Sequence, residues 1–115
     1  MPYWKNKNRF VSNKFGAVKQ TYNGYNYDSK REAQYAAELD WMKKAGEVKE
    51  WFRQVKLSID INGVHICNYF VDFEVHFEDG RREYHEVKGY ETEVWKMKWK
   101  LSKAIYTDYN FVLIK

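Results

Sequence analysis

The chain has 115 residues, a formal net charge of +4 at pH 7 and a single cysteine. This length suffices for one domain with a hydrophobic core and is too short for two, so we expect residues 1–115 to form a single domain. No apolar run approaches the length of a membrane span, and the first residues lack the apolar segment of a signal peptide. Because Cys67 has no second cysteine to pair with, the sequence excludes an intramolecular disulfide and favours a reducing, cytoplasmic location.

Basic residues gather at the two ends of the chain. Residues 1–27 contain no acidic side chain, and residues 1–16 show little periodicity, so we expect a basic arm there that is flexible without a partner. Basic side chains interleaved with Tyr and Trp suit nucleic acid, although lysines that only solvate the surface fit the composition equally well. The basic residues concerned are Lys5, Lys7, Arg9, Lys14 and Lys19 near the start, and Lys96, Lys98, Lys100 and Lys103 near the end.

Residues 17–27 favour a short hairpin whose two-residue turn is Asn23-Gly24. A helix is expected next, because Ser29 followed by Glu32 matches a capping box. Gly46 is well placed to end this helix. Its expected apolar stripe consists of Ala33, Ala36, Ala37, Leu39 and Met42.

Residues 47–61 favour one long strand or two short strands that meet at Gln54. Asn62-Gly63 is a strong hairpin turn, and it leads into a second strand over Val64–Phe77. A further turn leads into a third strand over residues 81–88. These strands predict an antiparallel sheet in the middle of the chain.

A second helix is expected after Thr92, which is a plausible N-cap. Its predicted apolar stripe consists of Val94, Met97, Leu101, Ala104 and Ile105. Residues 111–114 are all apolar and predict a last strand that joins the sheet after the helical crossover. The expected fold is therefore mixed α/β, with a central mixed or antiparallel sheet, two flanking helices, and the basic arm and hairpin at the N-terminus.

Two acids and a lysine fall on neighbouring strands of this sheet. Alternate side chains of a strand share a face, so Glu86 and Lys88 point the same way and Val87 points into the core. Pairing of the two strands brings Asp72 toward the same face. An ordinary cross-strand salt bridge would explain these residue types, but Asp72 stands among aromatic and branched residues, where an unpaired charge is costly.

Such a cluster suits a hard cation such as Mg²⁺, with Mn²⁺ as a substitute. Mg²⁺ is commonly held by one or two carboxylates, waters and a substrate phosphate. We expect Asp72, Glu86 and the backbone carbonyl of Val87 to be its ligands, and Lys88 to orient a water or stabilise a developing oxyanion.

Glu32 has two interpretations that the spacing leaves open. As the acid of a capping box, it would reach back to the backbone amide of Ser29. As a functional residue on the buried side of its helix, it would join the metal cluster directly or through water.

These residues together resemble the PD-(D/E)xK nuclease superfamily. Val71-Asp72, a hairpin and then Glu86-Val87-Lys88 are similar to the superfamily signature, and Glu32 stands on the preceding helix. Val71 replaces the proline of that signature, which is a structural position. The resemblance is closer to a phage-encoded branch, known as a domain of unknown function and similar to Holliday junction resolvases. It also covers Asn23-Gly24, residues 28–33, residues 45–47, Gln54, Gly89, Thr92 and the lysine-rich helix.

The resemblance implies a restriction-endonuclease-like core and a Mg²⁺-dependent endonuclease for branched DNA such as four-way junctions. Glu32, Asp72, Glu86 and Lys88 take the catalytic positions, with Gln54 and Thr92 in supporting ones. A phage origin implies the cytoplasm of a bacterial host. Since a junction resolvase cuts two opposed strands, a chain with one site is expected to act as a homodimer.

The basic side chains would hold DNA phosphates on either side of the cut. They are Lys5, Lys7, Arg9 and Lys14 of the arm and Lys96, Lys100 and Lys103 of the second helix. Two other functions stay open. One is a non-catalytic DNA-binding or recombination accessory protein, and the other is a nicking or restriction-like nuclease acting on duplex DNA.

The histidines allow a less favoured zinc site. His65 and Cys67 share one strand face, and His76 and His85 lie further along the same strands, where they are expected to face each other as a cross-strand pair. Zinc needs three or four such ligands in one place.

Overall fold

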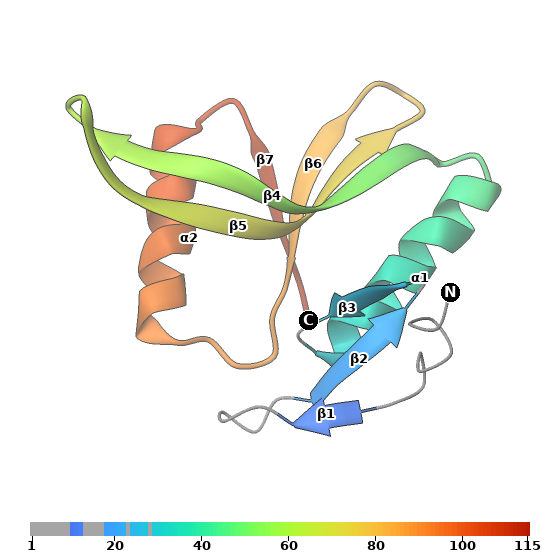
Figure 1. The fold of residues 1–115 in the computed structure, drawn as a ribbon. Coiled ribbons are helices and arrows are strands. Elements are labelled where there is room, and N and C mark those ends of the chain that lie inside the picture. The colour runs from blue at the N-terminus through green and yellow to red at the C-terminus, as the bar shows by residue number, and fades with distance from the viewer. Residues whose placement is uncertain (1–9, 13–17, 23, 28) are drawn as a thin grey trace. The chain divides into compact units, whose positions relative to one another are not determined.

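The computed structural model describes residues 10–12, 18–22, 24–27 and 29–115 (Figure 1). Its elements form a mixed α/β fold, as the sequence predicts, and the chain divides into two compact units, Met1–Ala45 and Gly46–Lys115. The expectation of a single domain stays a prediction. The elements in chain order are β1 (Phe10–Ser12), β2 (Val18–Tyr22), β3 (Tyr25–Tyr27), α1 (Lys30–Lys44), β4 (Val48–Ile61), β5 (Val64–Phe77), β6 (Arg82–Val87), α2 (Glu93–Ile105) and β7 (Asn110–Ile114).

The first unit contains a three-stranded antiparallel sheet in the order β1-β2-β3. The predicted hairpin is present as β2 and β3, with Tyr22 opposite Tyr25 and Gly24 at φ +85° in the turn. Strand β1 was not expected, because residues 1–16 were predicted to be a flexible arm. Phe10 and Val11 are good strand formers, and their backbone pairs with β2. The basic residues Lys5, Lys7, Arg9 and Lys14 lie outside the described residues.

Helix α1 begins and ends where the sequence predicts. The Ser29 hydroxyl accepts a hydrogen bond from the backbone amide of Glu32 at 3.1 Å, which caps the N-terminus. At the other end Gly46 has φ +84°, a conformation that favours glycine, directly after the C-cap residue Ala45. The buried side chains of α1 are Glu32, Ala33, Tyr35, Ala36 and Leu39, whereas the expected Met42 is only half-buried.

The second unit is a four-stranded mixed sheet in the order β4-β5-β6-β7 (Figure 1). Strands β4, β5 and β6 are antiparallel neighbours, and β7 runs parallel to β6 after the crossover through α2, as predicted. The β4–β5 turn has Asn62 at φ +53° and Gly63 at φ +79°, the two positive values that a tight hairpin turn needs. Strand β4 is one long strand, and Gln54 within it adopts φ +52°.

Helix α2 begins after Thr92 as predicted, but it buries a different face. Its buried side chains are Trp95, Trp99 and Ser102, whereas Val94 and Met97 of the expected stripe are more than half exposed. Both stripes recur at helical spacing, and two indoles bury far more apolar area than a valine and a methionine can. The indoles complete a core with Leu57, Ile59, Tyr69, Val71 and Tyr84 of the sheet.

Neither helix of the described residues is long and apolar enough to cross a membrane.

Candidate functional site

Asp72 and Glu86 lie side by side on the neighbouring strands β5 and β6. The backbone ladder of these strands runs from His76 opposite Arg82 to Phe73 opposite His85. One residue further, side chains replace the ladder. The backbone amide of Asp72 donates to Oε1 of Glu86 at 3.2 Å, and the backbone amide of Val87 donates to Oδ2 of Asp72 at 2.9 Å. The two carboxylates therefore accept the hydrogen bonds that join β5 to β6 at this point, in place of backbone carbonyls.

Both carboxyl groups are buried, with 8% of Asp72 and 3% of Glu86 exposed. Burial, and after it the negative charge of Asp72, raise the pKa of Glu86 to about 7. The hydroxyl of Tyr69, the amide of Asp72 and the charge of Lys88 act in the opposite direction. A cation placed between the two carboxylates would favour their ionised forms.

Trp95 and Tyr69 complete the surroundings of Glu86, and sequence reasoning missed both. The indole Nε1 of Trp95 donates to Oε2 of Glu86 at 3.0 Å and also lies 3.1 Å from the Tyr69 hydroxyl. Burial raises the pKa of Tyr69, and the charge of Glu86 raises it further, so this phenol stays protonated. A signal for Trp95 existed in the sequence. Trp95 and Trp99 recur one turn apart, and a buried indole N–H needs an acceptor.

Lys88 lies at the edge of this cluster. Its Nζ is 3.9 Å from Oε2 of Glu86 and 5.3 Å from the centre of the Trp95 ring. Its side chain is 28% exposed, so the ammonium group lies between the buried acids and solvent. The backbone amide of Lys88 donates to the carbonyl of Ile114, which ties this end of β6 to β7. The structure thus brings three of the predicted residues together, Asp72, Glu86 and Lys88.

Gln54 lies opposite Asp72 on the other neighbouring strand. Arg53 pairs with Phe73 and Val55 pairs with Val71, so the register places Gln54 across from Asp72. Gln54 has φ +52°, a left-handed conformation that residues other than glycine, asparagine and aspartate rarely adopt. Strain of this kind persists where the surroundings impose it, and it is common at functional sites.

Thr92 acts on the cluster through helix α2. Its hydroxyl accepts a hydrogen bond from the backbone amide of Trp95 at 3.1 Å and so caps the helix. The cap fixes the first turn, from which Trp95 reaches Glu86.

The predicted phosphate-binding lysines of α2 are exposed. Lys96 forms an ion pair with Glu93 at 3.5 Å, and the Nζ of Lys103 lies 5.5 Å from the centre of the Trp99 ring. Lys100 is exposed as well. A surface ion pair such as Lys96–Glu93 contributes little to stability, so Lys96 can exchange Glu93 for another anionic partner at little cost.

Glu32 and the Val87 carbonyl remain predictions as metal ligands. Glu32 is buried on α1 in the first unit, and its backbone amide is the group that contacts the Ser29 cap. The contact that Val87 makes with Asp72 is through its amide rather than its carbonyl.

Two carboxylates from Asp72 and Glu86 fit Mg²⁺, which keeps several waters and takes further oxygens from substrate phosphate. Across the described ranges, no three His, Cys, Asp or Glu side chains are grouped so that they could hold a metal ion. His76 pairs with Arg82 and His85 with Phe73, so the expected His76–His85 pair is wrong.

His65 belongs to a separate polar group at the end of the β4–β5 hairpin. Its Nδ1 lies 2.7 Å from Oδ1 of Asp60 and 3.0 Å from Oγ of Ser58. A catalytic triad uses both ring nitrogens, one toward the serine and one toward the aspartate. Here both partners meet the same nitrogen, so the group does not have the geometry of a catalytic triad.

A family model described as a protein of unknown function, DUF1064, matches residues 12–115. No curated protein matches the chain. The matched range includes the cluster of Asp72, Glu86, Lys88 and Trp95 and also Glu32, whereas Lys5, Lys7 and Arg9 precede it.

Proposed function

The chain belongs to the DUF1064 family of proteins of unknown function, and we propose that it is a metal-dependent endonuclease that hydrolyses phosphodiester bonds in DNA. The observation that carries the proposal is the buried pair of Asp72 and Glu86 with the Lys88 ammonium group at its edge. Two adjacent buried carboxylates are costly without a cation, and a cationic side chain beside them suits an anionic substrate.

The chain's own groups divide the work between them. Asp72 and Glu86 would hold Mg²⁺ or Mn²⁺, with the Val87 carbonyl as a further ligand. When bound, the metal lowers the pKa of a water and neutralises charge on the phosphate. Lys88 lies toward solvent, where its ammonium group can contact a phosphoryl oxygen and stabilise the negative charge that develops there. Trp95 donates to Glu86 and keeps one carboxylate oxygen oriented.

Four-way junctions are the proposed substrate, by the resemblance of the chain to junction resolvases. Cutting two opposed strands needs two sites, so the enzyme acts as a homodimer. Lys96, Lys100 and Lys103 hold phosphates beside the cut, together with the basic residues of the N-terminal segment.

A cleavage panel tests the proposal directly. End-labelled four-way junction, flap and plain duplex are incubated with the protein in Mg²⁺, in Mn²⁺ and in EDTA. We expect metal-dependent cleavage, fastest on the junction, and a loss of at least about 100-fold in Asp72→Asn and Lys88→Ala, since each removes a charge that acts in the transition state. The matched control is Glu83→Gln, on the same strand but bound to Arg81 and His85.

The outcomes separate the three functions. Cleavage that is as fast in Asp72→Asn as in the wild type would rule out the proposed site. Faster cleavage of plain duplex would identify a nicking or restriction-like nuclease. Salt-sensitive binding without cleavage in any metal would identify the accessory protein.

A further inference from the structure

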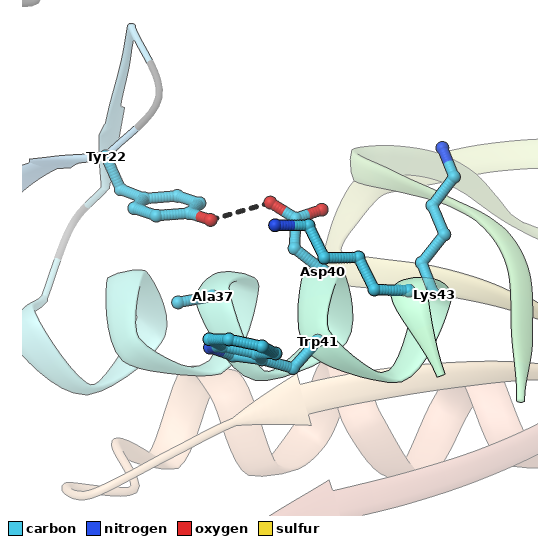
Figure 2. Close-up of a pocket in the computed structure, with 6 residues that line it drawn as sticks. Tyr22, Ala37, Asp40, Trp41 and Lys43 are labelled. Atoms are coloured by element: carbon cyan, nitrogen blue, oxygen red, sulfur yellow. Dashed lines mark hydrogen bonds between the residues drawn. The ribbon is translucent and has the colours of Figure 1, made fainter. Parts of the chain in front are cut away.

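The first unit has an open pocket of about 590 Å³ along α1 (Figure 2). This volume is within the range of small-molecule pockets. The described residues that line it are Tyr22 of β2 and Ala37, Asp40, Trp41, Lys43 and Lys44 of α1. None of the proposed catalytic residues lines it, and the proposed cleavage does not use it.

Trp41 is the most unusual residue of this pocket, because 70% of it is exposed. An indole is costly to leave in water, and exposed tryptophans that line a hollow are typical of binding sites. Ala37 lies one turn earlier and leaves the space beside the ring open (Figure 2).

The opposite wall is fixed by a hydrogen bond. The Tyr22 hydroxyl donates to Oδ2 of Asp40 at 2.6 Å, and Figure 2 shows the phenol ring reaching over the helix toward that carboxylate. The bond orients the Tyr22 ring and engages the carboxylate of the pocket. The Tyr22 ring is therefore already in place at the pocket before a ligand binds.

The charge at the open side is positive. Lys43 and Lys44 are both exposed, and the Nζ of Lys44 lies over the Trp41 ring, 5.3 Å from its centre. The contact of Lys44 with Trp41 is an exposed cation–π pair, which a planar base attached to a phosphate can replace: the base stacks on the indole and the phosphate takes the ammonium group. A base inside a duplex is stacked on its neighbours, whereas an unpaired base can stack on an aromatic side chain.

We propose that this pocket binds an unpaired base of DNA, stacked on Trp41, with the adjoining phosphate held by Lys43 and Lys44. The inference rests on the proposed function only in taking DNA as the ligand. It gives the first unit a role of its own, the recognition of a single-stranded or distorted region.

The test measures binding in EDTA, where cleavage does not occur. Fluorescence anisotropy compares a labelled 12-nucleotide thymidine strand with an abasic strand of equal length, which keeps every phosphate and lacks every base. We expect the wild type to bind the thymidine strand about tenfold more tightly. Trp41→Ala should bind both strands equally, at the level of the abasic strand, and Trp41→Phe should recover part of the preference.

The lysines should behave differently from the tryptophan. Lys43→Gln combined with Lys44→Gln should weaken binding of both strands and reduce the slope of log affinity against log salt by about one to two. The control is Ile66→Ala, which removes an exposed apolar side chain of β5 and should change neither affinity.

Equal binding of the two strands by the wild type would overturn the proposal, as would an unchanged preference in Trp41→Ala. A Trp41→Ala protein that binds thymidine normally but changes its oligomeric state in sedimentation would place Trp41 in a protein interface instead. Because these measurements need no metal and no cleavage, a failure here is distinguishable from a failure of the nuclease proposal.

Discussion

Asp72 and Glu86 join β5 to β6 through their carboxylates, each of which accepts a hydrogen bond from the backbone of the other strand. The two acids therefore continue the sheet beyond the last ladder pair, Phe73 with His85. Replacing either acid with alanine would leave a buried backbone amide without this acceptor and lower the free energy of unfolding by about 1–3 kcal/mol. Amide variants, which keep an oxygen, are needed to separate the chemistry of the site from its structural role.

Asp72→Asn is the first such variant. Asparagine keeps an oxygen for the amide of Val87 and removes the charge that raises the pKa of Glu86. In EDTA at pH 8 we expect the free energy of unfolding to rise by about 1 kcal/mol, because two like charges are no longer buried together. Urea denaturation followed by circular dichroism measures this change.

In Mg²⁺, the same urea titration should find the wild type more stable than Asp72→Asn. A ligand at 100 times its dissociation constant stabilises a protein by about 2.7 kcal/mol, and only the wild type keeps both carboxylates. Glu83→Gln, whose position is outside the cluster, should respond to Mg²⁺ as the wild type does. An equal gain in Asp72→Asn would contradict the metal site.

Trp95→Phe tests the hydrogen bond to Glu86. Phenylalanine keeps an aromatic ring in the core and removes the N–H that donates to Glu86 and lies beside Tyr69. We expect the affinity for Mg²⁺ to fall about tenfold, since partners that orient metal ligands contribute 10- to 100-fold. Isothermal titration gives the affinity. Trp99→Phe is the matched control, because Trp99 stacks on Trp95 but contacts the core and Phe111. Equal losses in the two variants would mean that only packing matters.

Much of the framework could be predicted because local chemistry determines it. Asn62-Gly63 demands a tight turn whatever surrounds it, and the hydroxyls of Ser29 and Thr92 cap helices through bonds that span three residues. The convergence of Asp72 and Glu86 also followed from strand periodicity and one hairpin. These features depend on neighbours in sequence.

The remaining features depend on partners that are distant in sequence. Both faces of α2 carry apolar residues at helical spacing, and the sheet core of Tyr69 and Val71 selects the face with Trp95. The left-handed backbone of Gln54 has no local signal, because glutamine is not a residue that prefers it. The spacing of Trp95 and Trp99 indicates a buried indole that needs an acceptor, but that this acceptor is Glu86, with Tyr69 beside it, depends on three segments that meet in the fold.

Gln54 provides a test of backbone strain at the site. In an ordinary strand, alanine is more stable than glycine by about 0.5–1 kcal/mol, but a left-handed position reverses that order. We therefore expect Gln54→Gly to be more stable than Gln54→Ala by about 1 kcal/mol in urea denaturation. At Lys56, an exposed position of the same strand, the usual order should hold, with Lys56→Ala the more stable variant. If the glycine variant is less stable than the alanine variant at both positions, the backbone at position 54 is not strained.

His85 should make stability depend on pH. Its ring is buried beside Phe77 with a hydrogen bond to Glu83, and burial lowers its pKa while Glu83 partly opposes the shift. The unfolded chain therefore binds a proton more readily than the folded one, and the contribution of His85 is fully present above about pH 6.5. It is lost as the pH falls from there through the pKa of the folded state.

His85→Gln isolates this contribution from that of Glu86, which both proteins share. We expect the difference in unfolding free energy between wild type and variant to favour the wild type at pH 7.5 and to shrink steadily as the pH falls to 5. Urea titrations in EDTA at half-unit pH steps measure it. A difference for His85→Gln that stays constant with pH would show that the His85 ring carries the same charge in both states.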